Sequence, residues 1–185
     1  MFYEPGKSGH GLPHDPFKSL VVPRPIGWIS TYAKDGTPNL APYSFFNAVG
    51  FAPPMVIFSS GTRRPDHSDK DSALNVEETG AFVVNMGSYD LRDQMTLSAE
   101  EVEPDVDEFD LAGLEMGRAK TVNAPLVVAS PAHLECKYMQ TVKLESTNPG
   151  VFSKVVFGEV VGVQINDDYL TDQGRVDVEK MRPVA

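Results

Sequence analysis

The sequence has a single cysteine, few basic residues and no long apolar run, and each shortage excludes a class of protein. Because Cys136 is alone, no internal disulfide can form, which is typical of a reducing compartment. The 16 Lys and Arg residues stand against 26 Asp and Glu residues, and the net charge of -10 disfavours nucleic acid and anionic membranes. No apolar run approaches the ~20 residues that span a bilayer, and residues 1–16 contain no apolar leader segment. We therefore expect a cytoplasmic protein that binds neither membrane nor nucleic acid.

The loops that mark several common enzyme classes are also missing. There is no Gly-x-Gly-x-x-Gly or Walker-type loop, which disfavours a Rossmann dinucleotide-binding unit, and no Gly-x-Ser-x-Gly elbow of a hydrolase. The histidines do not have metal-ligand spacing with Cys136. We therefore predict no catalytic side chain and no metal ligand. Such a protein can still be an enzyme if a bound cofactor carries the reaction.

The residues that are present predict a mainly β protein with one domain over residues 1–185. Of these residues 41% are hydrophobic, enough for a core. Short apolar or alternating runs predict strands at 26–33, 39–47, 55–60, 81–86, 132–145 and 154–165, and 55–60 and 81–86 are expected to be buried on both faces. Short helices are predicted at 70–79 and 88–98, an irregular segment at 1–20 and an acidic loop region at 99–125. Antiparallel strands at this spacing indicate a closed or nearly closed β-barrel.

A predicted β-hairpin over residues 24–47 organises the chain. Its two arms have the two-residue period of a strand, and the Asp-Gly pair at 35–36 suits the turn between them. Pro38 and Pro42 cannot donate ladder hydrogen bonds, so the second arm is expected to be an edge or bulged strand. Hydroxyl and amide groups stand beside aromatic rings at 43–47, which suits a slot for a planar, polar-rimmed ligand. The alternative is that these aromatic residues simply face the core.

A second candidate site combines the end of one strand with the start of a helix. Ser59-Ser60-Gly61 ends the strand 55–60, and Ser-Asp-Lys-Asp-Ser at 68–72 begins the helix 70–79. Free N–H groups, serine hydroxyls and one ammonium at a helix N-terminus attract a phosphate group. The alternative is that Ser68 or Asp69 only caps the helix. The two sites together predict a phosphorylated planar ligand in a barrel.

The later strands carry further patterns. Strand 132–145 alternates, so we expect a half-buried strand with one apolar face (Leu134, Cys136, Tyr138, Val142, Leu144) and one polar face (Glu135, Lys137, Thr141, Lys143, Glu145). Gly158 and Gly162 are expected to allow bends or bulges that help a barrel to close. The acidic stretch 100–108 is expected to be a solvated loop, and the alternative is a role in docking a partner or a metal.

Several segments, in order, resemble one known family. They are Arg-Pro-Ile-Gly-Trp-Ile-Ser-Thr (24–31), Asn-Leu-Ala-Pro-Tyr-Ser-Phe-Phe-Asn (39–47), Pro-Pro (53–54), Lys-Asp-Ser (70–72) with Asn75, and Gly-Ala-Phe-Val-Val-Asn (80–85). The family is the flavin reductase-like, FMN-binding split-barrel family, which includes flavoredoxin. The resemblance implies a Greek-key split β-barrel, a homodimer with flavin near the subunit interface, and FMN as the cofactor.

The resemblance also implies which residues bind the flavin. The phosphate would be addressed by Lys70 and Ser72, in agreement with the helix-start site above. The other flavin contacts would come from strand ends and backbone amides at Trp28, Ile29, Ser30, Thr31, Ser44, Phe45, Asn47, Ser59 and Ser60. One position departs from the family pattern, because relatives often have a histidine where this chain has Gln164. Glutamine cannot change its charge near neutral pH.

The activity that the resemblance implies is hydride transfer from NADH or NADPH to flavin and then to a small-molecule acceptor. The first alternative is an FMN-binding electron carrier without its own NAD(P)H activity. The second is a related barrel that binds pyridoxal phosphate or another phosphorylated ligand, or a purely structural dimer. The sequence does not choose between NADH and NADPH, and it does not identify the acceptor.

Overall fold

A computed structural model gives the fold and describes every residue except 6, 8, 15, 63–67, 104–105 and 148. The strands are β1 (Gly27–Tyr32), β2 (Pro38–Tyr43), β3 (Phe46–Phe51), β4 (Pro54–Gly61), β5 (Ala81–Met86), β6 (Met116–Arg118), β7 (Pro125–Val127), β8 (Ala132–Glu145) and β9 (Phe152–Ile165). The helices are α1 (Phe17–Leu20), α2 (Asp71–Thr79), α3 (Arg92–Leu97), α4 (Glu108–Leu111) and α5 (Val178–Met181), with 3-10 turns η1 (Tyr89–Leu91) and η2 (Asp167–Tyr169). In the described part of the chain, no helix is long and apolar enough to cross a membrane.

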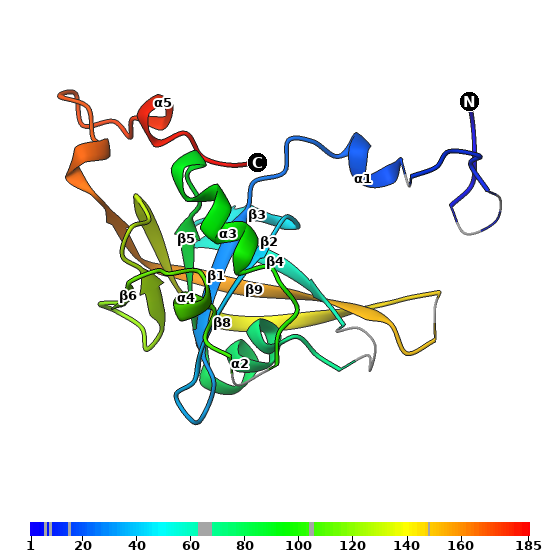
Figure 1. Cartoon of the computed structure of the whole chain (residues 1–185), viewed down its shortest axis with the longest axis horizontal. Coiled ribbons are helices and arrows are strands. Elements are labelled where there is room, and N and C mark those ends of the chain that lie inside the picture. The colour runs from blue at the N-terminus through cyan, green and yellow to red at the C-terminus, as the bar shows by residue number, and fades with distance from the viewer. Residues whose placement is uncertain (6, 8, 15, 63–67, 104–105, 148) are drawn as a thin grey trace.

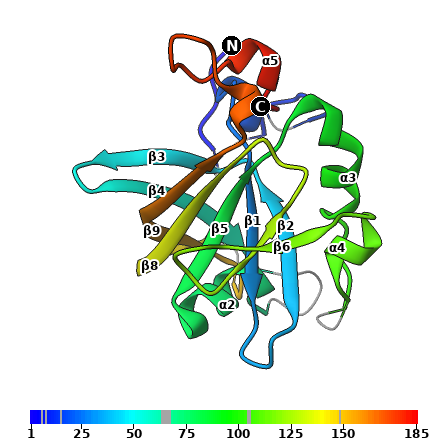
Figure 2. The same cartoon turned by 90° about the vertical axis from the view of Figure 1, so that its left-hand side faces the viewer.

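Seven strands form one antiparallel sheet in the order β2-β1-β5-β8-β9-β4-β3. Its two outermost strands, β2 and β3, follow each other in the chain with only Ser44 and Phe45 between them. The sheet therefore curls until its two edges approach each other. The Ser59 N–H on β4 donates to the Phe45 carbonyl (2.8 Å), which extends the β3–β4 pairing by one residue into this connection. Figures 1 and 2 show the curled sheet, with α2 at one end and the β3–β4 hairpin projecting from the body. The mainly β prediction is confirmed.

The opening hairpin forms, but its second arm is shorter than the predicted strand 39–47. β2 ends at Tyr43, and Phe46 and Asn47 belong to β3, which pairs with β4 at the opposite edge of the sheet. β1 pairs with β2 from Gly27↔Tyr43 to Tyr32↔Pro38, and Gly36 turns the chain at a φ of 94°. β2 is the edge of the sheet, so the missing N–H groups of Pro38 and Pro42 leave the ladder with β1 intact. The prediction of an edge strand is confirmed.

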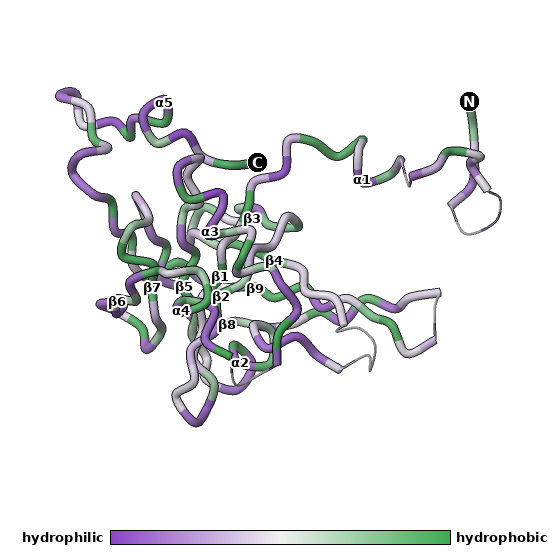
Figure 3. Tube along the Cα trace, viewed as in Figure 1, coloured by the Kyte–Doolittle hydropathy of each residue, from purple (hydrophilic) through white to green (hydrophobic). Residues whose placement is uncertain are grey.

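The barrel interior and the outside of the hairpin form two separate apolar clusters. The interior cluster includes Ile29, Phe58, Phe82 and Cys136, and burial raises the pKa of the Cys136 thiol. The second cluster lies on the other side of β1 and β2, where α3 and α4 pack (Trp28, Leu40, Met95, Phe109, Ala112, Leu114, Val127). β1 is therefore buried on both faces. Figure 3 shows hydrophobic segments in the crossing strands and also in the arm before β1, which reaches away from the sheet.

Further secondary-structure predictions need correction, including the loop region 99–125, in which α4 and β6 form. The N-cap position of α2 is Lys70, not Ser68 or Asp69, and its side chain makes no capping hydrogen bond. The helix ends as predicted at Gly80, whose φ of 76° is left-handed. Strand β4 is not buried on both faces but alternates between buried and half-buried positions, because no described helix packs on its outer face. The described residues of the segment 1–20 are irregular apart from the four residues of α1.

The predicted polar face of β8 is wrong at Glu135, which is only 1% exposed. The segment before β7 crosses over this strand, and its N–H groups at Lys120 (2.9 Å) and Thr121 (2.5 Å) donate to the Glu135 carboxylate. The Thr121 hydroxyl and the Gln164 amide donate to it as well. In the far half of β8 the predicted apolar face is also wrong, because it is exposed and not buried: Val142 and Leu144 are 41% and 47% exposed. No described segment covers that end of the β8–β9 hairpin.

Gly158 and Gly162 lie where the β8–β9 register shifts, which confirms the predicted bulges. Gly162 pairs with Glu135 beside one shift, and Gly158 pairs with Tyr138 beside the other. Gly158 also allows a close approach, because a Cβ there would lie 2.4 Å from the Phe82 ring. Both the bend of the strand and the packing of Phe82 inside the barrel therefore depend on the lack of a side chain at Gly158.

We expect Gly158→Ala to lower the free energy of unfolding by about 1–3 kcal/mol, because the buried Phe82 ring has to move aside. The measurement is urea denaturation followed by circular dichroism. Gly61→Ala is the matched control, since a Cβ at Gly61 meets nothing within 4 Å. Equal losses in the two variants would contradict this account of Gly158.

We expect Glu135 to contribute to acid stability. Burial alone would raise its pKa, but the donors at Lys120, Thr121 and Gln164 lower it from 4.5 to about 2. Because the folded value lies below the unfolded one, the contribution is complete above pH ~4.5 and is lost as the pH falls towards 2, about 3 kcal/mol in all.

The check is to measure the free energy of unfolding between pH 5 and pH 2 in Glu135→Gln and in Glu145→Gln, which alters an exposed acid on the same strand. The loss of stability on acidification should be smaller in Glu135→Gln and unchanged in Glu145→Gln. The same acid dependence in both variants would contradict the role of Glu135.

Candidate functional site

A pocket opens beside the edge strand β2, between the start of α2 and the segment that follows α3. It encloses about 50 Å³. One face of β2 lines it with Asn39, Ala41 and Tyr43, which the two-residue period of a strand brings to the same side. The rest of the wall is formed by Lys70, Asp71, Ser72, Ser98, Ala99, Glu100, Glu101, Val102 and Glu108.

Lys70 brings a positive charge to this pocket at the start of a helix. It is the N-cap of α2, and its side chain makes no capping bond to the first turn. Among the described residues, no carboxylate forms an ion pair with its ammonium group. The helix dipole adds positive potential at the same point. The ammonium group and the helix start attract an anion, whereas the carboxylates of Asp71, Glu100, Glu101 and Glu108 in the same pocket wall oppose one. The structure therefore places Lys70, which the sequence assigned to the phosphate, in a pocket.

Ser72 lines the same pocket, but its hydroxyl is engaged within the protein. Ser72 Oγ donates to Asn39 Oδ1 (2.7 Å), and Asn39 Nδ2 donates to Glu108 Oε1 (2.9 Å). The second carboxylate oxygen of Glu108 accepts the Leu40 N–H (3.0 Å). Burial raises the pKa of Glu108, and the Leu40 and Asn39 donors partly offset this effect. These bonds join α2, β2 and α4 around the pocket.

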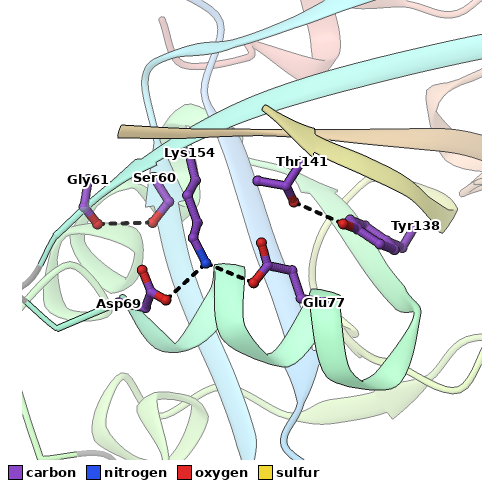
Figure 4. A network of polar contacts seen from close by, with 7 residues as sticks. All are labelled: Ser60, Gly61, Asp69, Glu77, Tyr138, Thr141 and Lys154. Carbon is purple, nitrogen blue, oxygen red and sulfur yellow. Dashed lines mark hydrogen bonds and ion pairs between the residues drawn. The ribbon is translucent and has the colours of Figure 1, made fainter. Parts of the chain in front are cut away.

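A second set of polar contacts holds α2 against the barrel (Figure 4). Lys154 on β9 donates to Asp69 Oδ2 (2.9 Å) and to Glu77 Oε2 (2.7 Å). Burial lowers the pKa of Lys154, but the two carboxylates outweigh this effect and raise it overall. Ser60, which pairs with Lys154 in the sheet, is buried, and its hydroxyl lies 3.4 Å from the Gly61 carbonyl. The ion pair with Lys154 thereby fixes Asp69, the residue directly before Lys70, in place.

The four predicted contacts on β1 lie in the core. Trp28, Ile29, Ser30 and Thr31 are each 0% exposed. Their polar groups are hydrogen-bonded inside the protein: Trp28 Nε1 donates to Ser98 Oγ (2.9 Å), Ser30 Oγ to the Pro125 carbonyl (2.6 Å), and Thr31 Oγ1 accepts from Asn75 Nδ2 (3.0 Å). Their assignment as flavin contacts stays a prediction.

The predicted contacts Ser44, Phe45, Asn47 and Ser59 lie where the two sheet edges meet. Phe45 and Asn47 are exposed, whereas Ser44 and Ser59 are half-buried. Asn47 Oδ1 accepts the N–H of the next residue (2.9 Å), and the Ser59 N–H is bonded to Phe45. Ser44 directly follows the pocket residue at the end of β2, so this junction adjoins the pocket. The assignment of these four to the flavin is likewise untested.

Of the residues that line the pocket, sequence reasoning assigned only Lys70 and Ser72 to the flavin, and it did not assign Asn39, Tyr43 or Glu108, among others. Asn39 and Tyr43 stand in the hairpin motif, and their shared face with Ala41 was a usable signal. Glu108 gave no signal, because it belongs to the acidic stretch that was predicted to be solvated. That prediction is wrong at Glu108, which α4 carries against the edge of β2. Within the described residues, no group of three or more potential ligands could hold a metal ion.

Comparison with known proteins identifies the family. Residues 19–178 match the model described as the flavin reductase like domain. This chain belongs to the flavin reductase-like family. A protein of Aquifex aeolicus is 41% identical over 166 residues, which are 90% of this chain and 81% of that protein. Proteins of this family typically bind FMN.

Solved structures of the family have the same fold. Nitrilotriacetate monooxygenase component B from Bacillus cereus is 25% identical, with a TM-score of 0.88 over 99% of this chain and 89% of that one. A split-barrel protein from Shewanella frigidimarina is 22% identical, with a TM-score of 0.73 over 86% and 76% of the two chains. The prediction of a flavin reductase-like split barrel is confirmed.

Proposed function

We propose that this protein binds FMN with its phosphate at Lys70, and that it passes hydride from NADH or NADPH to the flavin and on to a small acceptor. The observation that carries the proposal is the ammonium of Lys70 at the start of α2, beside a pocket, where no carboxylate of the described residues pairs with it and no side chain caps the helix. Family membership supports a flavin as the ligand. The names of two structural neighbours, a monooxygenase component and 2-nitrobenzoate 2-nitroreductase, support redox chemistry.

Among the residues that line the pocket, Lys70 at the start of α2 fits the phosphate end of FMN. An enclosed volume of about 50 Å³ suits a phosphate group, whereas a whole drug-sized ligand fills roughly 300–1,000 Å³. The flavin ring therefore needs further surface outside this pocket. The exposed junction at Ser44, Phe45 and Asn47 adjoins the pocket and would provide it.

We propose that a second copy of the chain completes the ring site. The β3–β4 hairpin beside the junction exposes apolar side chains, including Phe51 at 94% and Val49. The arm before β1 exposes more of them (Phe17, Leu20, Val21, Val22). Exposed apolar surface of this extent is typical of an interface. A homodimer would cover it and would enclose the ring at the same time.

When bound, FMN supplies the hydride chemistry, and the residues of this chain bind and orient it. Lys70 neutralises the phosphate. The Lys154 ion pairs and the Ser72–Asn39–Glu108 hydrogen bonds hold the start of α2 in place. We assign no general acid or base, because the site needs none for hydride transfer between two rings.

An FMN electron carrier is the second candidate function. The absence of a dinucleotide-binding loop favours it, because a nicotinamide nucleotide would have to bind without the usual phosphate loop. The third candidate function is a barrel that binds pyridoxal phosphate, which would use the same phosphate site.

We expect Lys70→Ala to weaken FMN binding about tenfold with little loss of stability, because one charge-assisted contact to the phosphate is removed. Quenching of flavin fluorescence during titration measures the Kd. Lys137→Ala removes the same charge from an exposed position on β8 and should leave the Kd unchanged. An unchanged affinity in Lys70→Ala would remove the phosphate role.

We expect the FMN-loaded protein to bleach at its visible flavin band when NADH or NADPH is added without oxygen. Running each nucleotide in turn identifies the donor. A protein that stays yellow with both nucleotides but bleaches with dithionite is a carrier. A protein that does not bind FMN at all contradicts both flavin functions.

A further inference from the structure

Glu108 differs from the other acidic residues of its segment because it is buried at the edge of the sheet. It is 6% exposed, whereas Glu100, Glu101 and Glu103 are exposed. Its carboxylate directs both oxygens at β2, one to the Leu40 N–H (3.0 Å) and one to the Asn39 side chain (2.9 Å). A buried carboxylate without such donors would be strongly destabilising. The two bonds therefore hold α4 at this position.

The bond from the Leu40 N–H to Glu108 takes the place of a ladder bond to a neighbouring strand. β2 is an edge, and every second N–H of an edge strand points away from the sheet without a ladder partner. The Glu108 carboxylate accepts such an N–H at Leu40. It also holds the Asn39 amide in one orientation, with Nδ2 towards Glu108 and Oδ1 towards the Ser72 hydroxyl (2.7 Å). The orientation of Asn39 is thus coupled to the position of Ser72 in the first turn of α2.

We propose that Glu108 is a positioning residue for the ligand phosphate: through Asn39 it fixes Ser72 and the start of α2 beside Lys70. The proposal rests on the proposed function, because it takes the phosphate of FMN to bind in this pocket. Glu108 does not need to touch the ligand. It acts on the ligand through two side chains that line the same pocket.

Charge and geometry predict opposite effects of Glu108 on an anionic ligand. A carboxylate in the pocket wall repels a phosphate, so removal of its charge alone should tighten binding. If Glu108 instead acts by positioning, removal of its second acceptor oxygen should weaken binding, because Asn39 and Ser72 lose their fixed arrangement. The sign of the change therefore separates the two roles.

The test compares FMN with riboflavin, which has the same ring without the phosphate. In Glu108→Gln the new NH2 group cannot accept a hydrogen bond, so it faces either the Leu40 N–H or the Asn39 amide as a second donor. We expect the Kd for FMN to rise on the order of tenfold and the Kd for riboflavin to change less than about twofold. Glu103→Gln, an exposed acid of the same segment that does not line the pocket, is the matched control and should alter neither value.

Glu108→Asp provides a second variant in case Glu108→Gln does not fold. It keeps the charge but withdraws the carboxylate by one methylene, so we expect the same selective loss of FMN affinity. Unchanged or tighter FMN binding in the folded variants would overturn the proposal. An equal loss for FMN and riboflavin would also overturn it, because that result indicates a general structural role.

The proposed function fails in a different way. If the unaltered protein binds FMN no better than riboflavin, the phosphate site itself is wrong and the role of Glu108 falls with it. If the unaltered protein prefers FMN and the variants keep that preference, only the role of Glu108 is wrong.

Discussion

The short connection between the first and last strands of the sheet is the constraint on which the rest of this structure depends. Ser44 and Phe45 alone join β2 to β3, so the opposite edges of a seven-stranded sheet have to meet. A flat sheet cannot satisfy this connection, and the bulges beside Gly158 and Gly162 supply the bending that closure requires. The closure is incomplete because β2 keeps one free side. The candidate pocket lies along that free side.

A free strand edge has to be covered or protected. At the edge of β2, polar groups provide this protection. Prolines in β2 reduce the number of N–H groups, and Glu108 accepts one that remains. The same carboxylate, with Asn39 and Ser72, brings α4, β2 and α2 to one point. A residue that protects the edge of the barrel therefore also shapes the wall of its pocket, so stability and ligand binding are linked at this place.

Local signals in the sequence predicted the strands and turns well. The Asp-Gly turn, the prolines of β2, Gly80 at the end of α2 and the glycines of β9 each act on their own neighbourhood, so their effects can be inferred from a few residues. The burial of side chains was predicted less well, because it depends on contacts with segments that are distant in the sequence. The alternation of β8 gave no indication that residues 120–121 would cross over Glu135. In the same way, Lys70 was identified from its local helix-start pattern, whereas Glu108 lies 68 positions from the strand N–H it accepts.

The burial of Cys136 gives the chain an internal reporter of its own opening. The thiol lies at 0% exposure inside the barrel beside Phe82, and burial raises its pKa, so the reactive thiolate hardly forms while the strands are closed. A water-soluble disulfide reagent can then modify the protein only when β5, β8 and β9 separate. Since this is the sole cysteine of the sequence, the rate of modification measures barrel opening directly, without an engineered label.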